Sequence, residues 1–382
     1  MSLGSLDTQR MNEALALAEG SFGLTEPNPR VGCVIGRPDG QVLGRGATQQ
    51  AGGPHAEVMA LRDAHSQGHD VAGATAWVTL EPCAHHGRTP PCCDALVAAG
   101  LSRVVVALRD PFAQVNGAGI ERLREAGIEV VIAQGDWPRR AAEVNPGFLS
   151  RVLRGRPWVR TKIAASLDAR TALPNGRSQW ITGPEARLDG HRFRRRSSAV
   201  LTGIGTVLAD DPRLDVRLDG QQPEQRPQPL RVVVDSHFRM PPSARILVPP
   251  GAVHVVGAID PAQARLALEA SGARLSALPG ADGRVDLGAL LQQLAQEGCN
   301  ELHVEAGAGL NGALLRAGWV DELLLYTAPM LLGPGRTVAD LPALEQLADA
   351  PVLRFTEATL VGPDLRVRAL TASGLALLTN LP

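Results

Sequence analysis

Short apolar runs alternate with segments of helical spacing through the first third of the chain. A run of roughly four to eight apolar residues bounded by turn residues is typical of a buried strand, whereas apolar positions three and four apart indicate an amphipathic helix. The strands predicted in this way are 31–36, 41–48, 74–80, 103–108 and 128–133, and the helices are 11–19, 56–65, 93–100 and 119–127. This alternation predicts a three-layer α/β domain with a mixed sheet.

A second α/β series follows a loosely patterned, arginine-rich stretch at 138–157, which we interpret as a connector. The segment 287–298 predicts a helix that stops at a glycine, and the Gln- and Pro-rich segment 219–229 predicts a surface loop. The series begins at 158–168, and its further predicted strands are 197–203, 230–235, 252–258, 301–307 and 321–329. We therefore predict two α/β domains, residues 1–150 and residues 151–382.

The charge and aromatic content of the chain argue against some kinds of binding partner. The net charge is −1 and aromatic residues make up 3% of the chain, so we expect no nucleic-acid partner, which would need a basic surface or stacking platforms. No apolar run approaches the roughly 20 residues of a membrane helix, and the N-terminal segment does not resemble a signal peptide. The five cysteines do not form the pattern of a disulfide framework. We therefore expect a cytoplasmic protein without a membrane contact.

Lysine occurs once, at Lys162, among 38 basic residues. Arginine replaces it wherever a surface charge suffices, so the exception indicates a position that needs a compact ammonium group. Survival of one lysine by chance explains the composition equally well, and the composition alone leaves both explanations open.

A His-x-Glu segment and a later Pro-Cys segment together predict a zinc site. His55, Cys83 and Cys92 supply one nitrogen and two sulfur ligands, which leaves a fourth tetrahedral position for water, as in catalytic zinc sites. Zinc lowers the pKa of a bound water, and the neighbouring carboxylate of Glu57 can carry a proton from this water to a leaving nitrogen. The pattern is typical of zinc nucleobase deaminases, although eight residues separate the cysteines here instead of two.

The predicted elements bring these residues to one point. His55 begins a predicted helix, Cys83 follows a predicted strand, and Cys92 lies at the start of the next helix. Helix N-termini carry partial positive charge, which favours thiolate ligands.

A closed structural zinc site is the alternative, with a fourth ligand from His85, His86 or Cys93. Glu57 would be an unusual neighbour for such a site. A chain that binds no metal is a further alternative. The combination of one histidine and two cysteines argues against it more strongly than against a structural zinc site.

Several motifs resemble one known family. HAEVMAL (55–61) and PCAHHGRTPPC (82–92) resemble the deaminase half of the bifunctional deaminase/reductases of riboflavin biosynthesis, and TEPNPRVGCVI (25–35) resembles their substrate loop, which here contains Asn28. Motifs that resemble the reductase half are KIAASLDARTA (162–172), SQWITG (178–183), TVLADDPRLDVR (206–217), VVVDSHFR (232–239) and VEAGAGLNGALL (304–315). The resemblance implies a cytidine-deaminase-like α/β/α domain followed by a dihydrofolate-reductase-like α/β domain.

The chain departs from the family pattern at two places. DPFAQVNG stands where the family often has Asp-Pro-Asn-Pro, so Phe112 and Ala113 weaken any assignment of substrate contacts at 110–119. SLDAR stands where the family often has SLDGR, so Ala169 replaces a glycine that would tolerate a positive φ.

Two glycine-rich turns of the second half are candidates for phosphate binding. A Gly-x-Gly at 203–205 is weak evidence, and 307–315 joins a strand to a helix whose N-terminus can hold an anion. Taken alone, 307–315 is explained slightly better by an ordinary strand–turn–helix connection, and the resemblance shifts the interpretation to NADPH. The cofactor residues that it implies are Ala164, Ser178, Trp180, Thr206, Asp210, Ser236, Gly307, Ala308, Gly309, Leu310, Asn311, Gly312 and Ala313.

The resemblance also implies that Arg194, Leu214, Arg217 and Glu305 face a substrate. A guanidinium group binds a ribose phosphate through two hydrogen bonds, although a solvated surface charge explains most of the arginines at 192–198 equally well.

Lys162 gains a role from this assignment, because we expect it at the head of the strand that lines the cofactor and substrate sites. We hypothesise that Lys162 and Asp210 flank the reacting sugar and that the lysine donates a proton to the sugar oxygen as hydride arrives.

The predicted enzyme thus has two activities in one chain. The resemblance implies zinc-dependent hydrolytic deamination of a diaminopyrimidinone ribosylamine 5′-phosphate, followed by NADPH-dependent reduction of the ribosyl chain to ribityl, in a homo-oligomer, a dimer or a tetramer. The competing predictions are a nucleic-acid deaminase, which low charge and few aromatics oppose, and a regulator that binds ligands without catalysis.

Overall fold

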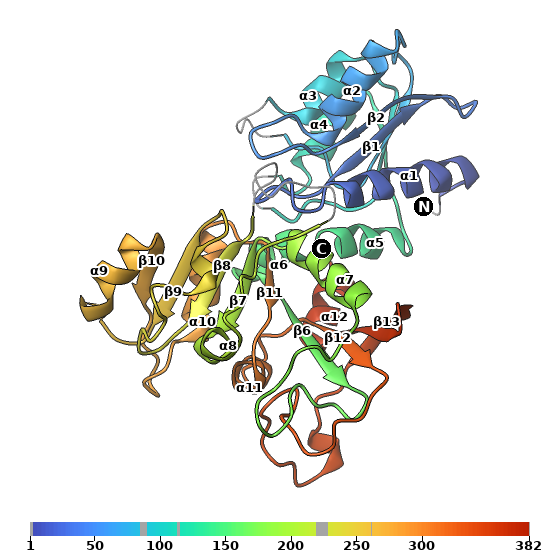
Figure 1. Ribbon diagram of the computed structural model, residues 1–382. Helices are drawn as coiled ribbons and strands as arrows, with labels where there is room; N and C mark the ends of the chain where they lie inside the picture. The colour runs from blue at the N-terminus through green and yellow to red at the C-terminus, as the bar shows by residue number, and fades with distance from the viewer. Residues whose placement is uncertain (1–2, 85–89, 113–114, 219–227, 261, 382) are drawn as a thin grey trace. The chain divides into compact units, whose positions relative to one another are not determined.

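The computed structural model describes residues 3–84, 90–112, 115–218, 228–260 and 262–381. The chain forms two compact units, Met1–Arg154 with Leu377–Pro382 and Gly155–Ala376. In both units strands and helices alternate along the chain (Figure 1). Across the described ranges, we find no helix that combines the length and the apolar character needed to span a bilayer.

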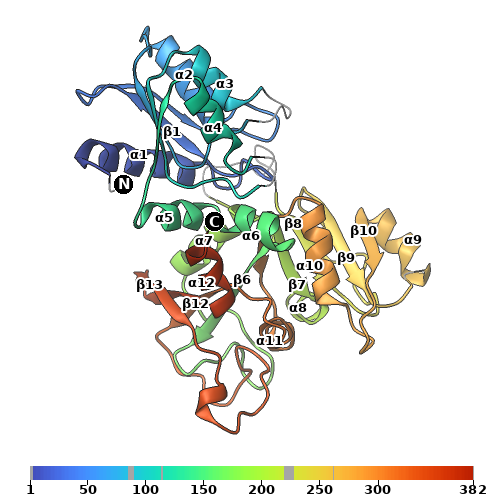
Figure 2. The ribbon, with the colours of Figure 1, turned by 180° about the vertical axis from the view of Figure 1, so that it is seen from behind.

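The first unit has a mixed sheet with helices on both faces. Its strands are β1 (Gly32–Gly36), β2 (Val42–Ala47), β3 (Thr75–Val78), β4 (Arg103–Val106) and β5 (Glu129–Ile132), and its helices are α1 (Ser5–Gly20), α2 (Ala56–Ser66), α3 (Cys92–Ala98), α4 (Ala118–Glu125), α5 (Trp137–Val144) and α6 (Pro146–Arg154). The order is β2–β1–β3–β4–β5, with β1 antiparallel to both neighbours and β3, β4 and β5 parallel. Figures 1 and 2 show α2, α3 and α4 on one face and α1 and α5 on the other, which confirms the predicted three layers.

Glycines on β1 and β2 allow the helices to pack closely on this sheet. A Cβ at Gly32 would lie 1.9 Å from the carbonyl oxygen of Ala14 in α1, and a Cβ at Gly46 would lie 2.1 Å from that of Ala56 in α2. Because no side chain fits in so little space, any larger residue would push the helix away from the sheet. Gly46 therefore fixes the first turn of α2, which begins directly after His55, at short distance from the sheet.

The stretch 138–157 is largely helical, so its interpretation as a loose connector is wrong. Both helices begin with a proline in the first turn, where the missing N–H costs nothing and the fixed φ suits a helix: Pro138 in α5 and Pro146 in α6. Ala141, Ala142 and Val144 form the buried side of α5. The apolar face of α5 is short and lies among prolines and many arginines. The sequence pattern therefore indicated a connector instead of helices.

The second unit has a large, mostly parallel sheet. Its strands are β6 (Trp158–Ser166), β7 (Ala199–Gly203), β8 (Leu230–Val234), β9 (Val253–Gly257), β10 (Ala273–Ala277), β11 (Glu301–Val304), β12 (Glu322–Ala328), β13 (Arg354–Val361) and β14 (Asp364–Leu370), and its helices are α7 (Pro184–Arg195), α8 (Ile204–Asp210), η2 (Arg245–Leu247), α9 (Ala262–Ala270), α10 (Leu287–Gln296), α11 (Ala308–Arg316), η3 (Leu347–Asp349) and α12 (Ala372–Thr379). The order is β10–β9–β8–β7–β11–β6–β12–β14–β13, in which β14 is antiparallel to both of its neighbours, β12 and β13, and the other pairs are parallel.

The chain reverses its direction across this sheet next to β11. From β7 it continues outward to β8, β9 and β10, whereas β6 and β12 lie on the other side of β11. In parallel α/β sheets the crevice beyond the carboxyl ends of the strands at such a reversal is the usual place for a ligand. The fold therefore directs attention to the ends of β6, β7 and β11.

One face of this sheet changes from apolar to polar at β11. Alternate residues of β7, β8 and β9, namely Val200, Val233 and Val255, belong to an apolar cluster. In register with Val200, the next strands place His303 of β11 and Arg160 of β6 on the same face. Polar side chains, one of them charged, thus occupy the continuation of an apolar layer.

Several elements were not predicted, among them α7, α8 and the hairpin β13–β14. The segment 219–229, predicted as a loop, lies largely outside the described residues. Ala169, which replaces the family's glycine, has a φ of +59°, so the left-handed conformation is retained with alanine, at a cost of about 1–2 kcal/mol.

Two candidate active sites

Three potential zinc ligands lie together in the first unit. The ligand atoms of His55, Cys83 and Cys92 are all within 4.8 Å of one another. The Nδ1 atom of His55 is 3.2 Å from Cys92 Sγ and 3.6 Å from Cys83 Sγ. One imidazole and two thiol groups at these separations are a donor set that suits zinc.

Two helix N-termini position these ligands. His55 is the N-cap residue of α2, and Cys92 is the first residue of α3. The amide of Cys92 donates a hydrogen bond to Cys83 Sγ at 3.4 Å. Hydrogen bonds from the Cys92 thiol and the His55 imidazole lower the pKa of Cys83, which favours its thiolate form.

The candidate fourth ligands do not join this cluster within the described residues. Cys93 donates from its Sγ to Asp94 Oδ1 at 3.7 Å, and it is not among the clustered groups. His85 and His86 lie outside the described residues. Three ligands fit a site that keeps one position for water.

Glu57 and the potential zinc ligands His55 and Cys83 line a cavity of about 340 Å³. Glu57 lies in the first turn of α2 and is 3% exposed. Burial raises the pKa of Glu57 to about 7, and the charge of Cys83 adds to this effect. Asn28, from the predicted substrate loop, is half-buried in the cavity wall. All residues predicted for deamination therefore meet at one place.

Glu81 is a residue of this cavity that the sequence analysis missed. Its buried carboxylate accepts hydrogen bonds from the amides of Asp110, Gly117, Gly119 and Ile120, at 3.1–3.3 Å. Glu81 therefore ties the segment that precedes Cys83 to the N-terminus of α4 and to the far wall of the cavity. Its place immediately before the Pro-Cys motif was the available signal.

That far wall contains the first departure from the family pattern. Asp110 and Phe112 both line the cavity, and Phe112 donates its amide to Asp110 Oδ1 at 2.9 Å. Burial, reinforced by the neighbouring Glu81, raises the pKa of Asp110 to about 7. Ala113 lies outside the described residues.

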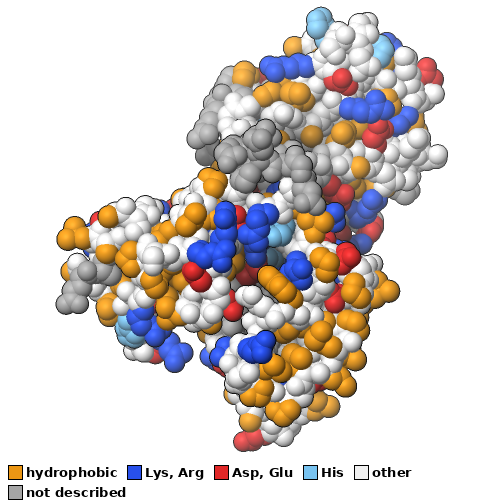
Figure 3. All heavy atoms as spheres, viewed as in Figure 1, with side chains coloured by type: hydrophobic (Ala, Val, Ile, Leu, Met, Phe, Trp, Pro, Cys, Tyr) orange, Lys and Arg blue, Asp and Glu red, His pale blue; other side chains and the backbone are white. Residues whose placement is uncertain are grey.

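The candidate reductase site lies at the carboxyl ends of the parallel strands. Lys162 is the fifth residue of β6, level with the end of β11, and not at the head of the strand as expected. Its Nζ is 3.9 Å from Glu305 Oε2. Burial lowers the pKa of Lys162. Figure 3 shows Lys and Arg side chains gathered over the region labelled β7, β8 and β11 in Figure 1.

The residues predicted to face a substrate make specific contacts in this unit. Arg194 holds both carboxylate oxygens of Glu305 and donates to the carbonyl oxygen of Asp215 at 2.9 Å. Arg217 is exposed and pairs with the Asp215 carboxylate. The side chain of Leu214 is buried in the apolar cluster under β7, β8 and β9, so only its main chain can face a ligand.

The residues predicted for the cofactor lie on several elements of the same edge. Asp210, the last residue of α8, accepts a hydrogen bond from Ser178 Oγ at 3.4 Å, and within the described residues no hydrogen bond or ion pair joins it to Lys162. Ser236 follows β8 and accepts from the Val285 amide at 3.3 Å. Ala164 and Thr206 are half-buried on β6 and α8, whereas Trp180 is 68% exposed beside Arg187.

Most of the segment 307–313 is helix and not loop. Gly307 is the N-cap residue of α11, which contains Ala308, Gly309, Leu310, Asn311, Gly312 and Ala313. A Cβ on Gly307 would meet nothing within 4 Å, whereas one on Gly312 would lie 2.2 Å from the carbonyl oxygen of Asp340. Asn311 is buried and donates to the carbonyl oxygens of Ala306 and Val338. Gly307 is thus open to a ligand, while Asn311 and Gly312 secure the helix.

Comparison with known proteins agrees with these two sites. Residues 5–108 match the cytidine and deoxycytidylate deaminase zinc-binding region, and residues 157–367 match the RibD C-terminal domain. The riboflavin biosynthesis protein RibD of Escherichia coli is 48% identical over 368 residues, which are 94% of this chain and 98% of that protein. The chain belongs to the RibD family. This membership confirms the predicted bifunctional deaminase and reductase of riboflavin biosynthesis.

Solved structures of RibD proteins have the same fold along the whole chain. RibD of Acinetobacter baumannii, form 1, is 42% identical, with a TM-score of 0.86, and covers 96% of this chain and 99% of its own. The deaminase/reductase of Thermotoga maritima is 30% identical, with a TM-score of 0.85 and the same coverage. These matches confirm the predicted fold class in both halves, and the zinc-binding region that matches residues 5–108 contains the cluster of His55, Cys83 and Cys92.

Proposed function

We propose that the chain removes an amino group from a diaminopyrimidinone ribosylamine 5′-phosphate and then reduces the ribosyl chain of the product to ribityl with NADPH. The Thermotoga relative is described as a diaminohydroxyphosphoribosylaminopyrimidine deaminase and 5-amino-6-(5-phosphoribosylamino)uracil reductase, which supports these substrates. We assign the first reaction to residues 1–150 and the second to residues 151–382. The observation that carries the proposal is the three-ligand cluster beside Glu57 in a cavity whose size is typical of small-molecule sites.

In the deaminase site His55, Cys83 and Cys92 would hold the zinc ion. Zinc, when bound there, would make hydroxide available near neutral pH for attack on the amine-bearing carbon. Glu57 takes the proton of the attacking water and delivers it to the departing amine, which leaves as ammonia. Asn28 binds the pyrimidine from the cavity wall, where it is half-buried.

In the reductase site the cofactor phosphates would bind at Gly307 and the first turn of α11, which ends at Asn311. The other residues that would line the cofactor site are Ala164, Ser178, Trp180, Thr206 and Ser236. NADPH, when bound there, supplies the hydride. Lys162 donates a proton to the sugar oxygen, and Glu305 holds the ammonium group in place. Arg194 and Arg217 bind the substrate phosphate, with the main chain of Leu214 beside it. We assign Asp210 to the cofactor side with Ser178, its partner.

Removal of zinc separates the two reactions. We expect a chelator to abolish ammonia release, and added zinc to restore it, because the hydrolytic water then has no metal to activate it. NADPH oxidation with the deaminated intermediate supplied directly should continue at its original rate. The measurement is ammonia and NADPH absorbance on the same preparation, and ammonia release by metal-free protein would contradict the assignment.

A small-molecule substrate is favoured over nucleic acid. The net charge of −1 provides little attraction for a phosphate backbone, and a nucleic-acid deaminase would release ammonia from RNA but not from the free pyrimidine phosphate. A regulator without catalysis would release none from either. We also propose a cytoplasmic location, which the free state of Cys33, Cys83, Cys92, Cys93 and Cys299 supports.

We propose further that the protein is a homo-oligomer, a dimer or a tetramer. Exposed apolar side chains of the second unit include Phe355 and Leu360 on the edge strand β13, and Leu344, Leu347 and Val352 in the segment that precedes this strand. An apolar surface of this kind on an unpaired edge is characteristic of a surface that a partner covers.

Charges on that edge should weaken the assembly. We expect Phe355→Glu combined with Leu360→Glu to lower the mass measured by light scattering toward that of one chain, because apolar contact area is lost and like charges face each other. The matched control Leu266→Glu changes an exposed leucine of α9 and should leave the mass unchanged. A wild-type protein that has the mass of one chain at all concentrations would contradict the proposal.

A further inference from the structure

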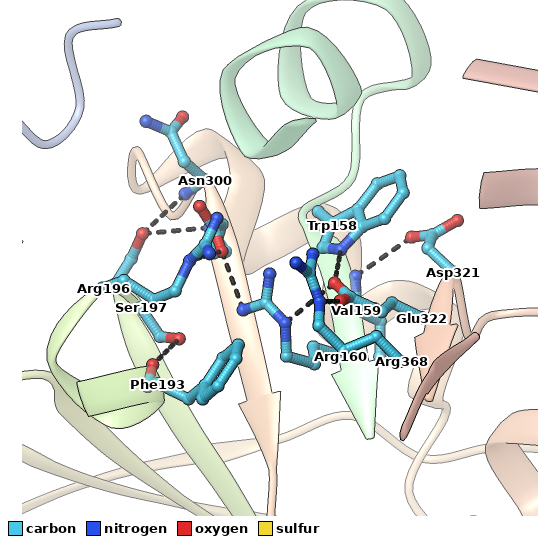
Figure 4. Close-up of polar contacts among 12 residues, drawn as sticks. Trp158, Val159, Arg160, Phe193, Arg196, Ser197, Asn300, Asp321, Glu322 and Arg368 are labelled. Carbon is cyan, nitrogen blue, oxygen red and sulfur yellow. Dashed lines mark hydrogen bonds and ion pairs between the residues drawn. The ribbon is translucent and has the colours of Figure 1, made fainter. Parts of the chain in front are cut away.

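A row of charged side chains lies beneath the reductase site on β11, β6 and β12. Arg160, 0% exposed, donates to Glu301 Oε2 and to Glu322 Oε2, both at 2.8 Å. Arg196 adds a contact to Glu301 at 3.2 Å, and Arg368 one to Glu322 at 2.6 Å. Figure 4 shows Arg160 in the middle of this network, with Arg196 on one side and Glu322 with Arg368 on the other. Each carboxylate therefore has two guanidinium partners, so neither Glu301 nor Glu322 lacks a positive charge beside it.

His303 lies between this network and the pair formed by Lys162 and Glu305. The register of the parallel strands places it beside Arg160, one alternate position before Glu305. The imidazole is 0% exposed, and its Nε2 atom is 3.4 Å from Glu305 Oε1. Neither ring nitrogen makes a hydrogen bond within the described residues. A buried polar group without a full partner costs free energy, so its presence calls for a reason.

Burial favours the neutral form of the His303 ring. Burial lowers the pKa of His303, and the positive charges of Arg160 and Arg194 add to this effect against the opposing Glu305. A neutral imidazole has one N–H group to donate. Glu305 Oε1, 3.4 Å from Nε2, is an acceptor within reach of this group.

We propose that His303 is a positioning residue for the reduction, which holds one carboxylate oxygen of Glu305 so that the other faces Lys162. The inference rests on the role proposed above for Lys162. Glu305 Oε2 is the oxygen near the ammonium group, at 3.9 Å, whereas Oε1 is the oxygen near His303. The backbone of Glu305 is already fixed, since its amide donates to the carbonyl oxygen of Leu201 and its carbonyl oxygen accepts from Thr202 Oγ1.

The role becomes necessary when substrate binds. Arg194 contacts both oxygens of Glu305 in this structure, and the same guanidinium group is proposed to bind the substrate phosphate. When Arg194 exchanges the carboxylate for the phosphate, His303 remains beside Oε1 and keeps the carboxylate from rotating. Lys162 then keeps its orientation toward the sugar oxygen during proton donation.

The test compares two substitutions at His303 in the full-length protein, with the deaminated intermediate and NADPH as substrates. His303→Phe fills the space without a donor, and His303→Gln returns an N–H group near the place of Nε2. We expect His303→Phe to lower the kcat of NADPH oxidation about 10–100-fold, the scale of a displaced catalytic group, with the KM for NADPH nearly unchanged. His303→Gln should recover most of the loss.

A matched control shows which effects follow from the loss of any buried histidine. His254 on β9 is also 0% exposed and neutral in the same sheet, but it contacts Ser276 and Arg274. His254→Phe should lower thermal stability and leave kcat unchanged for the folded fraction. Wild-type kcat in His303→Phe, or an equal loss in His303→Gln and His303→Phe, would overturn the proposal. Absence of NADPH oxidation in the wild-type protein would instead overturn the proposed reductase function itself.

Discussion

Glu57→Gln is expected to lower ammonia release by about 10²–10⁴-fold, the usual contribution of a positioned general acid–base group. The amide keeps the size of the side chain and its place in the first turn of α2, but it cannot accept a proton from water. Zinc content should remain at the wild-type level, because His55, Cys83 and Cys92 are unchanged. NADPH oxidation with the deaminated intermediate should also remain unchanged.

A matched control separates this effect from a general loss of charge. Glu121 lies on α4 of the same unit, is exposed, and pairs with Arg124, so Glu121→Gln should leave both reactions unchanged. The measurements are the initial rate of ammonia release and zinc per chain by elemental analysis. Wild-type ammonia release in Glu57→Gln would exclude the proton-transfer role, even if zinc were present.

Lys162→Arg is expected to lower NADPH oxidation by about 10²–10⁴-fold while ammonia release stays the same. Burial lowers the pKa of Lys162, which makes its ammonium group a better proton donor than an exposed lysine. Arginine keeps the charge but does not give up its proton near neutral pH. Its longer planar group also does not fit the contact of Nζ with Glu305 Oε2.

Lys162→Met provides the comparison that isolates proton donation from charge. If donation is the role, the Arg and Met variants should be similarly slow, because neither delivers a proton. If a positive charge is enough, the Arg variant should be much faster than the Met variant. Near wild-type turnover in Lys162→Arg would contradict the proposal. Chance would then explain why the chain has a single lysine.

The zinc site was predictable because its information is local. His55 and Glu57 lie at the start of the same helix, and Cys83 and Cys92 lie at the two ends of one connecting segment. The residues within each pair are therefore close in the sequence, and their proximity can be predicted without knowledge of the whole fold. Glu81 escaped because its partners are main-chain amides at 110–120, and main-chain groups leave no trace in residue type.

The reductase site was less predictable because it depends on distant pairings. The contact of Arg194 with Glu305 joins residues 111 positions apart, and nothing local indicates that two residues expected to meet a substrate also bind each other. Leu214 appeared in a motif but packs in the core. Lys162 was placed at the head of its strand because the end of β11, which sets its level, is fixed only by the register of the sheet.

The segments missed altogether have weak patterns for physical reasons. The strand β13 is an edge strand that is mostly exposed, so burial imposes little alternation on it. In α7 the arginines that pair with Glu305 and with other acidic groups of the unit conceal the narrow apolar side formed by Ala186 and Phe193. Elements stabilised by ion pairs do not produce the hydrophobic periodicity from which helices and strands are predicted.

The most direct test of the two-reaction account is the mass of the products formed from the diaminopyrimidinone ribosylamine 5′-phosphate. Without NADPH, we expect one product, in which an NH group is replaced by oxygen, and an equal amount of ammonia. With NADPH, we expect that product to gain two hydrogen atoms while NADPH is consumed in equal amount. An unchanged substrate mass without NADPH, or no gain of hydrogen with it, would contradict the account.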